Sequence, residues 1–193
     1  MATQQEAYGQ VANYNISPGT RADGQSSALE VDSKGNVKTV LGAGYQVNQF
    51  GTTTPFTITL ASLASSTAGV GRQSTLITGV TAHSAIIAVQ ITVSGSANPT
   101  ANTPIYVYLI RSDGTLADDG AGASDAGITI INAPLLGVLN CSATTQSAVY
   151  TGIFDTSVIG VLSPTFGIAI VQSTGQALNA TAGNLIAEYT LVT

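Results

Sequence analysis

Histidine and cysteine, the side chains that most readily act as a general base and as a nucleophile near neutral pH, occur once each in the sequence. His83 is the single histidine, in the sequence Thr81-Ala82-His83-Ser84, and Cys141 is the single cysteine. Nucleophilic catalysis needs a base held against the nucleophile and a third group that orients the base. The chain has no Gly-x-Ser-x-Gly sequence that would form a nucleophile elbow. We therefore interpret His83 as a turn residue before a strand and Cys141 as a small buried apolar residue.

The densest cluster of potential metal ligands is an acidic loop that contains Asp113, Asp118, Asp119 and Asp125. Calcium prefers several oxygen ligands, and aspartate-rich loops with glycine can supply them. The spacing does not match an EF-hand, however, and Asp and Gly are also ordinary turn residues. A solvated loop is the favoured interpretation and a calcium site is the alternative. A glycoside hydrolase built on paired carboxylates is disfavoured, because the chain has no tryptophan to line a sugar-binding cleft.

The other motifs of enzymes are missing from the sequence. It has no phosphate-binding loop, no Gly-x-Gly-x-x-Gly after a strand and no Cys/His metal set. We predict that the protein is not an enzyme, that it needs no cofactor, and that it has no catalytic, cofactor-binding or metal-ligating residues.

The charge balance narrows the possible partners. The chain has five Lys and Arg, ten Asp and Glu, and a net charge of −5, so it lacks the basic face of a nucleic-acid binder. No apolar run approaches the ~18 residues of a membrane span, and the N-terminus lacks the basic and apolar regions of a signal peptide. Only 8% of residues are charged, against about 25% in ordinary domains. Such a surface is poorly protected against association, which favours a subunit covered by partners.

The composition changes near residue 50. Residues 1–50 hold seven of the fifteen charged residues and no long apolar run, whereas residues 51–193 hold eight charges, of which only Arg72 and Arg111 are basic. We interpret residues 1–50 as an extended arm with one β-hairpin over Leu29–Val40, because Asp-Ser-Lys-Gly-Asn supplies the turn. Residues 51–193 are interpreted as the globular domain.

That domain is predicted to be all-β, an antiparallel β-sandwich of jelly-roll type. About eight short strands alternate with turn signals, which is typical of sandwiches and barrels. One short helical turn is expected at Ser62–Thr67. The aromatic residues are assigned mostly to the core or to packing between subunits. The expected strands are Phe56–Leu60, Ala88–Ser94, Ile105–Ile110, Gly127–Ile131, Val149–Phe154, Gly167–Val171 and Leu185–Val192.

Two sets of segments carry a resemblance to a known class of proteins. Asp23-Gly24-Gln25, followed by the segment Leu29–Lys38, resembles a sequence that opens many virion structural proteins of tailed bacteriophages. The second set is similar to phage particle proteins of β-sandwich type, such as head decoration or tail-associated subunits. It comprises Gly71–Ser74, Ile105–Tyr108, Arg111–Gly114, Gly152–Asp155 and Phe166–Leu178.

The resemblance implies a structural protein of a phage virion, most simply a capsid decoration (cement) subunit on the outside of the head. Its partners would be the major capsid protein or other virion proteins, and further copies of itself in a homotrimer. The arm would lie across neighbouring subunits and add backbone hydrogen bonds to exposed strand edges. The alternative is a structural or receptor- or glycan-binding module associated with a tail, collar or fibre. An exposed aromatic platform in a loop would favour glycan binding, and the loops are instead rich in Ser, Gly, Asp and Asn.

Overall fold

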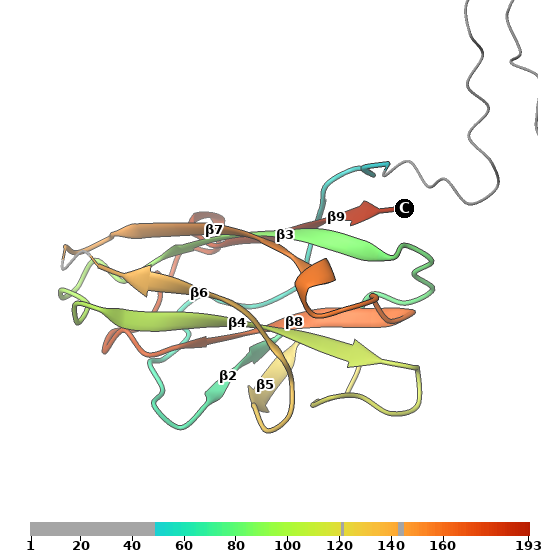
Figure 1. Ribbon diagram of the computed structural model, residues 1–193. Helices are drawn as coiled ribbons and strands as arrows, with labels where there is room; N and C mark the ends of the chain where they lie inside the picture. Colours follow the sequence, from blue (N-terminus) through green and yellow to red (C-terminus); the bar gives the residue numbers. More distant parts are fainter. Residues whose placement is uncertain (1–48, 121, 143–144) are drawn as a thin grey trace, which may run out of the picture. The chain divides into compact units, whose positions relative to one another are not determined.

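The computed structural model describes residues 49–120, 122–142 and 145–193, which belong to one compact unit, Val47–Thr193. The described residues form two packed antiparallel sheets, which confirms the all-β antiparallel sandwich (Figure 1). The jelly-roll connectivity stays a prediction. One sheet has the strand order β1-β9-β3-β7, formed by Thr54–Pro55, Ile186–Val192, Ser84–Thr92 and Val149–Asp155. The other has the order β5-β2-β8-β4-β6, formed by Ala126–Thr129, Val70–Gln73, Thr165–Gln172, Thr103–Ser112 and Leu135–Cys141.

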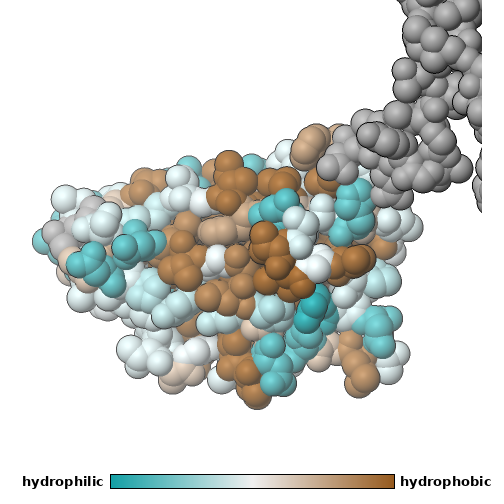
Figure 2. Space-filling view, in the orientation of Figure 1, coloured by the Kyte–Doolittle hydropathy of each residue, from teal (hydrophilic) through white to brown (hydrophobic). Residues whose placement is uncertain are grey.

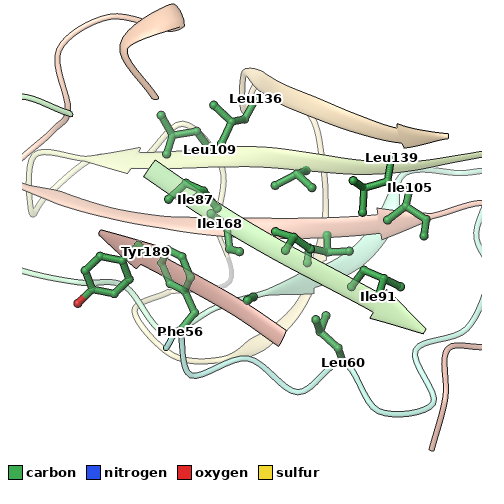
Figure 3. Packing of buried hydrophobic residues seen from close by; sticks show 14 of the residues in the cluster. Phe56, Leu60, Ile87, Ile91, Ile105, Leu109, Leu136, Leu139, Ile168 and Tyr189 are labelled. Carbon is green, nitrogen blue, oxygen red and sulfur yellow. The ribbon is translucent and has the colours of Figure 1, made fainter. Parts of the chain in front are cut away.

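The core lies between the two sheets and follows the period-two pattern of the strands. In β3, Ile87, Val89 and Ile91 are buried, and their counterparts across the core come mainly from β4 and β8 (Figure 3). Phe56, Phe166 and Tyr189 form an aromatic cluster with ring centroids 4.8–6.1 Å apart. The core assignment is thus confirmed for these three aromatic residues. A smaller cluster on the outer side of the five-stranded sheet contains Ile110, Ile128, Ala133 and Ala169.

Six of the seven expected strands coincide with observed ones, and three of the observed strands, β1, β2 and β6, are not among those expected. β2 is short and contains Gly71, Arg72 and Gln73, so its apolar pattern is weak. β6 follows Pro134 and is interrupted by Gly137, and its pairing with β4 shifts register between Val107 and Tyr108. Both segments are strands because the neighbouring strands supply their backbone hydrogen bonds. This tertiary effect leaves no signal in the local sequence pattern.

The expected strand Phe56–Leu60 is wrong, although its burial alternates as predicted: Phe56 and Leu60 are buried, and the intervening threonines are exposed. The observed edge strand β1 is Thr54–Pro55. Beyond it, the backbone divides its hydrogen bonds between the two sheets. The Phe56 N–H donates to the Ala187 carbonyl (2.8 Å), whereas the Thr57 carbonyl accepts from the Thr75 N–H (2.8 Å). The segment crosses between the sheets instead of extending either ladder.

The helical turn expected at Ser62–Thr67 is also wrong. Its backbone groups bond to distant segments: the Leu63 carbonyl accepts from the Leu178 N–H and from Nε2 of the buried Gln172, both at 2.9 Å. The Ser62 N–H donates to the Asn179 carbonyl at 3.1 Å. The helical turns in the described residues are the 3₁₀ turns η1, Thr156–Val158, and η2, Ala182–Asn184. The hairpin expected at Leu29–Val40 lies outside the described residues.

Candidate functional site

The acidic loop was the foremost candidate for a metal site, and the structure gives each of its carboxylates a separate structural partner. Asp119 is buried, and its Oδ2 accepts hydrogen bonds from three consecutive backbone N–H groups, those of Ile131, Asn132 and Ala133, at 3.0, 2.8 and 2.6 Å. Burial alone would raise the pKa of Asp119, but the three donors outweigh it and lower the pKa. This carboxylate therefore fixes the turn between β5 and β6.

Two further carboxylates of the loop neutralise the two arginines of the domain. Asp118 pairs with Arg111 (Nε to Oδ2, 2.7 Å), and Asp125 pairs with Arg72. Asp125 also accepts a hydrogen bond from the Thr59 hydroxyl. Burial raises the pKa of Asp125, but the hydrogen bonds from Arg72 and Thr59 outweigh it and leave the pKa lowered.

Asp113 forms a local turn, because its Oδ1 accepts from the N–H groups of Thr115 and Leu116, both at 2.7 Å. These backbone donors lower the pKa of Asp113. In the part of the chain that the structure describes, no three His, Cys, Asp or Glu side chains come together in a metal-binding group. The four aspartates are spread over separate contacts, so the arrangement favours the solvated, turn-rich loop over the calcium site.

The two isolated residues with nucleophile or base chemistry lie where the sequence analysis expected them. His83 directly precedes β3, where its backbone N–H donates to the Val192 carbonyl at 3.2 Å and its carbonyl accepts from Leu162. Cys141 ends β6 and is fully buried. Burial raises the pKa of the Cys141 thiol to about 11, against which a hydrogen bond with Tyr150 acts weakly. Both expectations, a turn histidine and a buried apolar cysteine, are confirmed.

A different feature of the molecule is a pair of adjacent edge strands, β6 and β7, which we call the β6–β7 edge. Within the described residues each pairs with a single strand, β6 with β4 and β7 with β3, and the two lie side by side where the sheets meet (Figure 1). Each is seven residues long, and Asp155 is the only charged residue in either. Large apolar side chains are exposed on and beside this edge: Leu135, Val138, Val149, Ile153, Val158 and Val161.

The space-filling view shows hydrophobic surface gathered over this side of the domain (Figure 2). Ile153, with 76% of its surface exposed, is the most exposed apolar residue within a strand of this edge. The backbones can approach closely underneath because Gly137 and Gly152 leave room for the Phe154 ring. A Cβ on Gly137 would stand 2.2 Å from Phe154 Cε1. The apolar residues can be read from the sequence, but their exposure cannot, because it depends on the positions of β6 and β7 at the edges of their sheets.

A second feature is a groove of about 430 Å³ on the outer face of the five-stranded sheet. Tyr106 and Tyr108 line it, with ring centroids 6.0 Å apart and planes inclined at 43°. Both are half-buried and point away from the main core, since their strand partners are Val171 and Ala169 while the core residue Ile170 faces Val107. Of the two assignments made for the aromatic residues, core burial does not hold for these two tyrosines, and packing between subunits stays a prediction. Their i, i+2 spacing on a strand was the signal that could have placed them on one face.

Comparison with known proteins adds no relative: no family model, curated protein or solved structure matches the chain. None of the helices in the described ranges has the length and apolar character needed to cross a membrane.

Proposed function

We propose that this chain is a structural subunit of a tailed-phage virion, a head decoration protein that binds across major capsid protein subunits and associates with further copies of itself as a trimer. The observation that carries the proposal is the β6–β7 edge. Two long neighbouring edge strands with exposed apolar side chains and a single charge are a surface for association. A protein that worked as a free monomer would be expected to protect such an edge.

The distribution of charge supports the same reading. Of the eight charged residues in 51–193, four form the ion pairs Arg72–Asp125 and Arg111–Asp118. Asp113, Asp119 and Asp155 are engaged with backbone N–H groups. These carboxylates keep their negative charge, but of the four that are not paired with arginine only Asp155 lies in β6 or β7, so burying this edge against partners carries a small electrostatic cost.

The assembly mechanism follows from the chemistry of strand edges. An extended segment of a partner can add to β6 or β7 through backbone hydrogen bonds, while the exposed apolar side chains pack against it. Repeated over a symmetric shell, many such modest contacts give strong attachment. Residues 1–50 of each copy are proposed to reach neighbouring subunits in this way. Deletion of residues 1–28 is then expected to abolish incorporation into particles while the domain still folds.

Immunogold labelling of purified particles, with an antibody against this chain, tests the proposal. Gold distributed over the heads is the expected result. Gold confined to a tail, collar or fibre would overturn the decoration role in favour of the tail-associated alternative. Absence of the chain from a protein inventory of the same particles would overturn the virion role altogether.

A further inference from the structure

The groove on the outer face of the five-stranded sheet has an apolar surface and a hydrogen-bonding surface, which together complement a sugar ring. Its lining divides into an aromatic and apolar part, Tyr106, Tyr108, Pro104 and Val171, and a hydroxyl-bearing part, Ser66, Thr67 and Ser173. A pyranose ring likewise has apolar C–H faces and a rim of hydroxyls. The volume of about 430 Å³ falls within the roughly 300–1,000 Å³ of small-molecule sites.

The aromatic wall is held in place by the sheet. Tyr106 and Tyr108 project side by side from β4, which is hydrogen-bonded on both sides, to β8 and β6. Tyr108 also packs against the outer apolar cluster. Desolvation by this packing raises the pKa of Tyr108. Rings fixed in this way can stack against a ligand with little loss of conformational entropy.

The hydroxyl wall is held just as firmly, and it offers both a donor and acceptors. The Ser66 Oγ accepts hydrogen bonds from the N–H groups of Ala68 and Val70, both at 3.2 Å, which leaves its own proton for a ligand. The Ser173 Oγ donates to the Ser66 carbonyl at 3.0 Å, which leaves its lone pairs to accept. A sugar hydroxyl both donates and accepts, so this pair can satisfy it.

The lack of charged residues in the lining of the groove favours a neutral sugar over an acidic one. No residue that lines the groove is charged. The two arginines of the described residues lie on the opposite face of the sheet, because Arg72 pairs with the core residue Ile170 and Arg111 with the core residue Phe166. Nothing in the groove would compensate for the desolvation of a carboxylate, sulfate or phosphate.

We propose that this groove is a binding site for a neutral oligosaccharide, with one sugar ring stacked on Tyr106 and Tyr108 and its hydroxyls bonded to Ser66 and Ser173. The site is separate from the β6–β7 edge, so it adds a function to the proposed assembly role and does not depend on it. A subunit repeated over a particle would present many copies, and even weak sites would then act together.

The test uses the full chain on an array that carries neutral oligosaccharides, sialylated and sulfated oligosaccharides, and a proline-rich peptide. The neutral glycan that binds best is then titrated by calorimetry against the wild-type chain and three variants. Tyr106→Leu and Tyr108→Leu keep apolar bulk but remove the aromatic face, and each is expected to weaken binding by about fivefold to tenfold. Ile186→Lys, at an exposed position of β9 in the opposite sheet and outside the β6–β7 edge, is the surface control and is expected to leave the affinity within about twofold of wild type.

Circular dichroism and thermal unfolding establish that each variant is folded before it is titrated. Neutral-glycan binding that both tyrosine variants weaken and Ile186→Lys leaves intact supports the site. The proposal is overturned if no neutral glycan binds, if only the acidic glycans or the peptide bind, or if folded Tyr106→Leu and Tyr108→Leu both bind as wild type does. None of these results depends on particle incorporation, so failure here is distinguishable from failure of the assembly role.

Discussion

The edge strands at the two ends of the sandwich differ in length, proline content and charge. We call the end formed by β1 and β5 the protected end, and the other end is the β6–β7 edge. At one end, β1 has two residues and contains Pro55, and β5 has four residues. The Arg72–Asp125 pair lies beside this end, where β2 pairs with β5. At the other end, β6 and β7 have seven residues each and share one charge. Short strands, proline and charge are the devices that prevent strand addition. Their concentration at one end is why we propose the other end as the surface for contact with partners.

The largest expected effect comes from giving the β6–β7 edge the protection it lacks. Ile153→Lys places a charge in the middle of β7, and we expect incorporation into particles to fall at least about tenfold because an interface would have to bury that charge. Quantitative mass spectrometry of purified particles measures the copy number. Thr129→Lys puts the same charge on the exposed outer edge of β5 and is expected to incorporate normally. Equal incorporation of the two variants would contradict the difference between the ends.

Asp119 holds the turn between β5 and β6, and Asp119→Ala is expected to lower the free energy of unfolding by about 3 kcal/mol. The substitution leaves three N–H groups without their acceptor, the donors of Ile131, Asn132 and Ala133. Chemical denaturation measures the change. Asp113→Ala is the control, because its carboxylate makes only a local exposed turn, and it is expected to cost less. A cost no greater than that of the control would show that Asp119 does not hold the turn.

Gly137 and Phe154 close the other end, and they are expected to act as a coupled pair. Gly137→Ala should cost about 2 kcal/mol, since its Cβ would overlap the Phe154 ring. In a Phe154→Ala background the same change should cost much less, because the overlapping ring is gone. Simple additivity of the two substitutions in denaturation experiments would refute this packing.

Acid is expected to loosen the protected end before the β6–β7 edge. The folded-state pKa values of Asp119 and Asp125 are lowered from 3.8. Their contribution to stability is therefore fully present above about pH 4 and is lost as the pH falls through the lowered folded values. Hydrogen exchange at stepwise lower pH should show β5 and the following turn opening first. The same experiment on Asp119→Asn should show a weaker pH dependence, and an unchanged dependence would exclude Asp119 as a cause.

The smallest expected effect concerns Cys141. Because burial raises the pKa of its thiol to about 11, the folded protein should not react with Ellman's reagent at pH 8, and one thiol should appear on denaturation. Rapid reaction of the native chain would show that the end of β6 opens readily.

The main strands could be predicted because each carries its own alternating pattern, as in Ile105–Ile110 and Gly167–Val171. The failures occurred where distant partners decide the local structure. Phe56–Leu60 alternates in burial, yet it crosses between sheets, and Ser62–Thr67 is bound by Gln172 and Leu178 from the other end of the sequence. β6 could not be recognised because its ladder with β4 contains a register shift.

The candidate sites show the same division. The isolation of His83 and Cys141 could be read from the sequence, because a missing partner residue is missing in any fold. The pairing of Arg72 with Asp125 could not, since it joins β2 to a loop fifty-three residues away. The groove beside Tyr106 and Tyr108 was missed because a loop was expected to carry any aromatic platform, whereas a strand carries it.

Assembly through the β6–β7 edge is tested most directly by hydrogen–deuterium exchange, comparing the chain in assembled particles with the same chain free in solution. We predict that amides of β6 and β7 become strongly protected on assembly, whereas those of β1 and β5 exchange alike in both states. Unchanged exchange in β6 and β7, or protection confined to β1 and β5, would contradict this prediction.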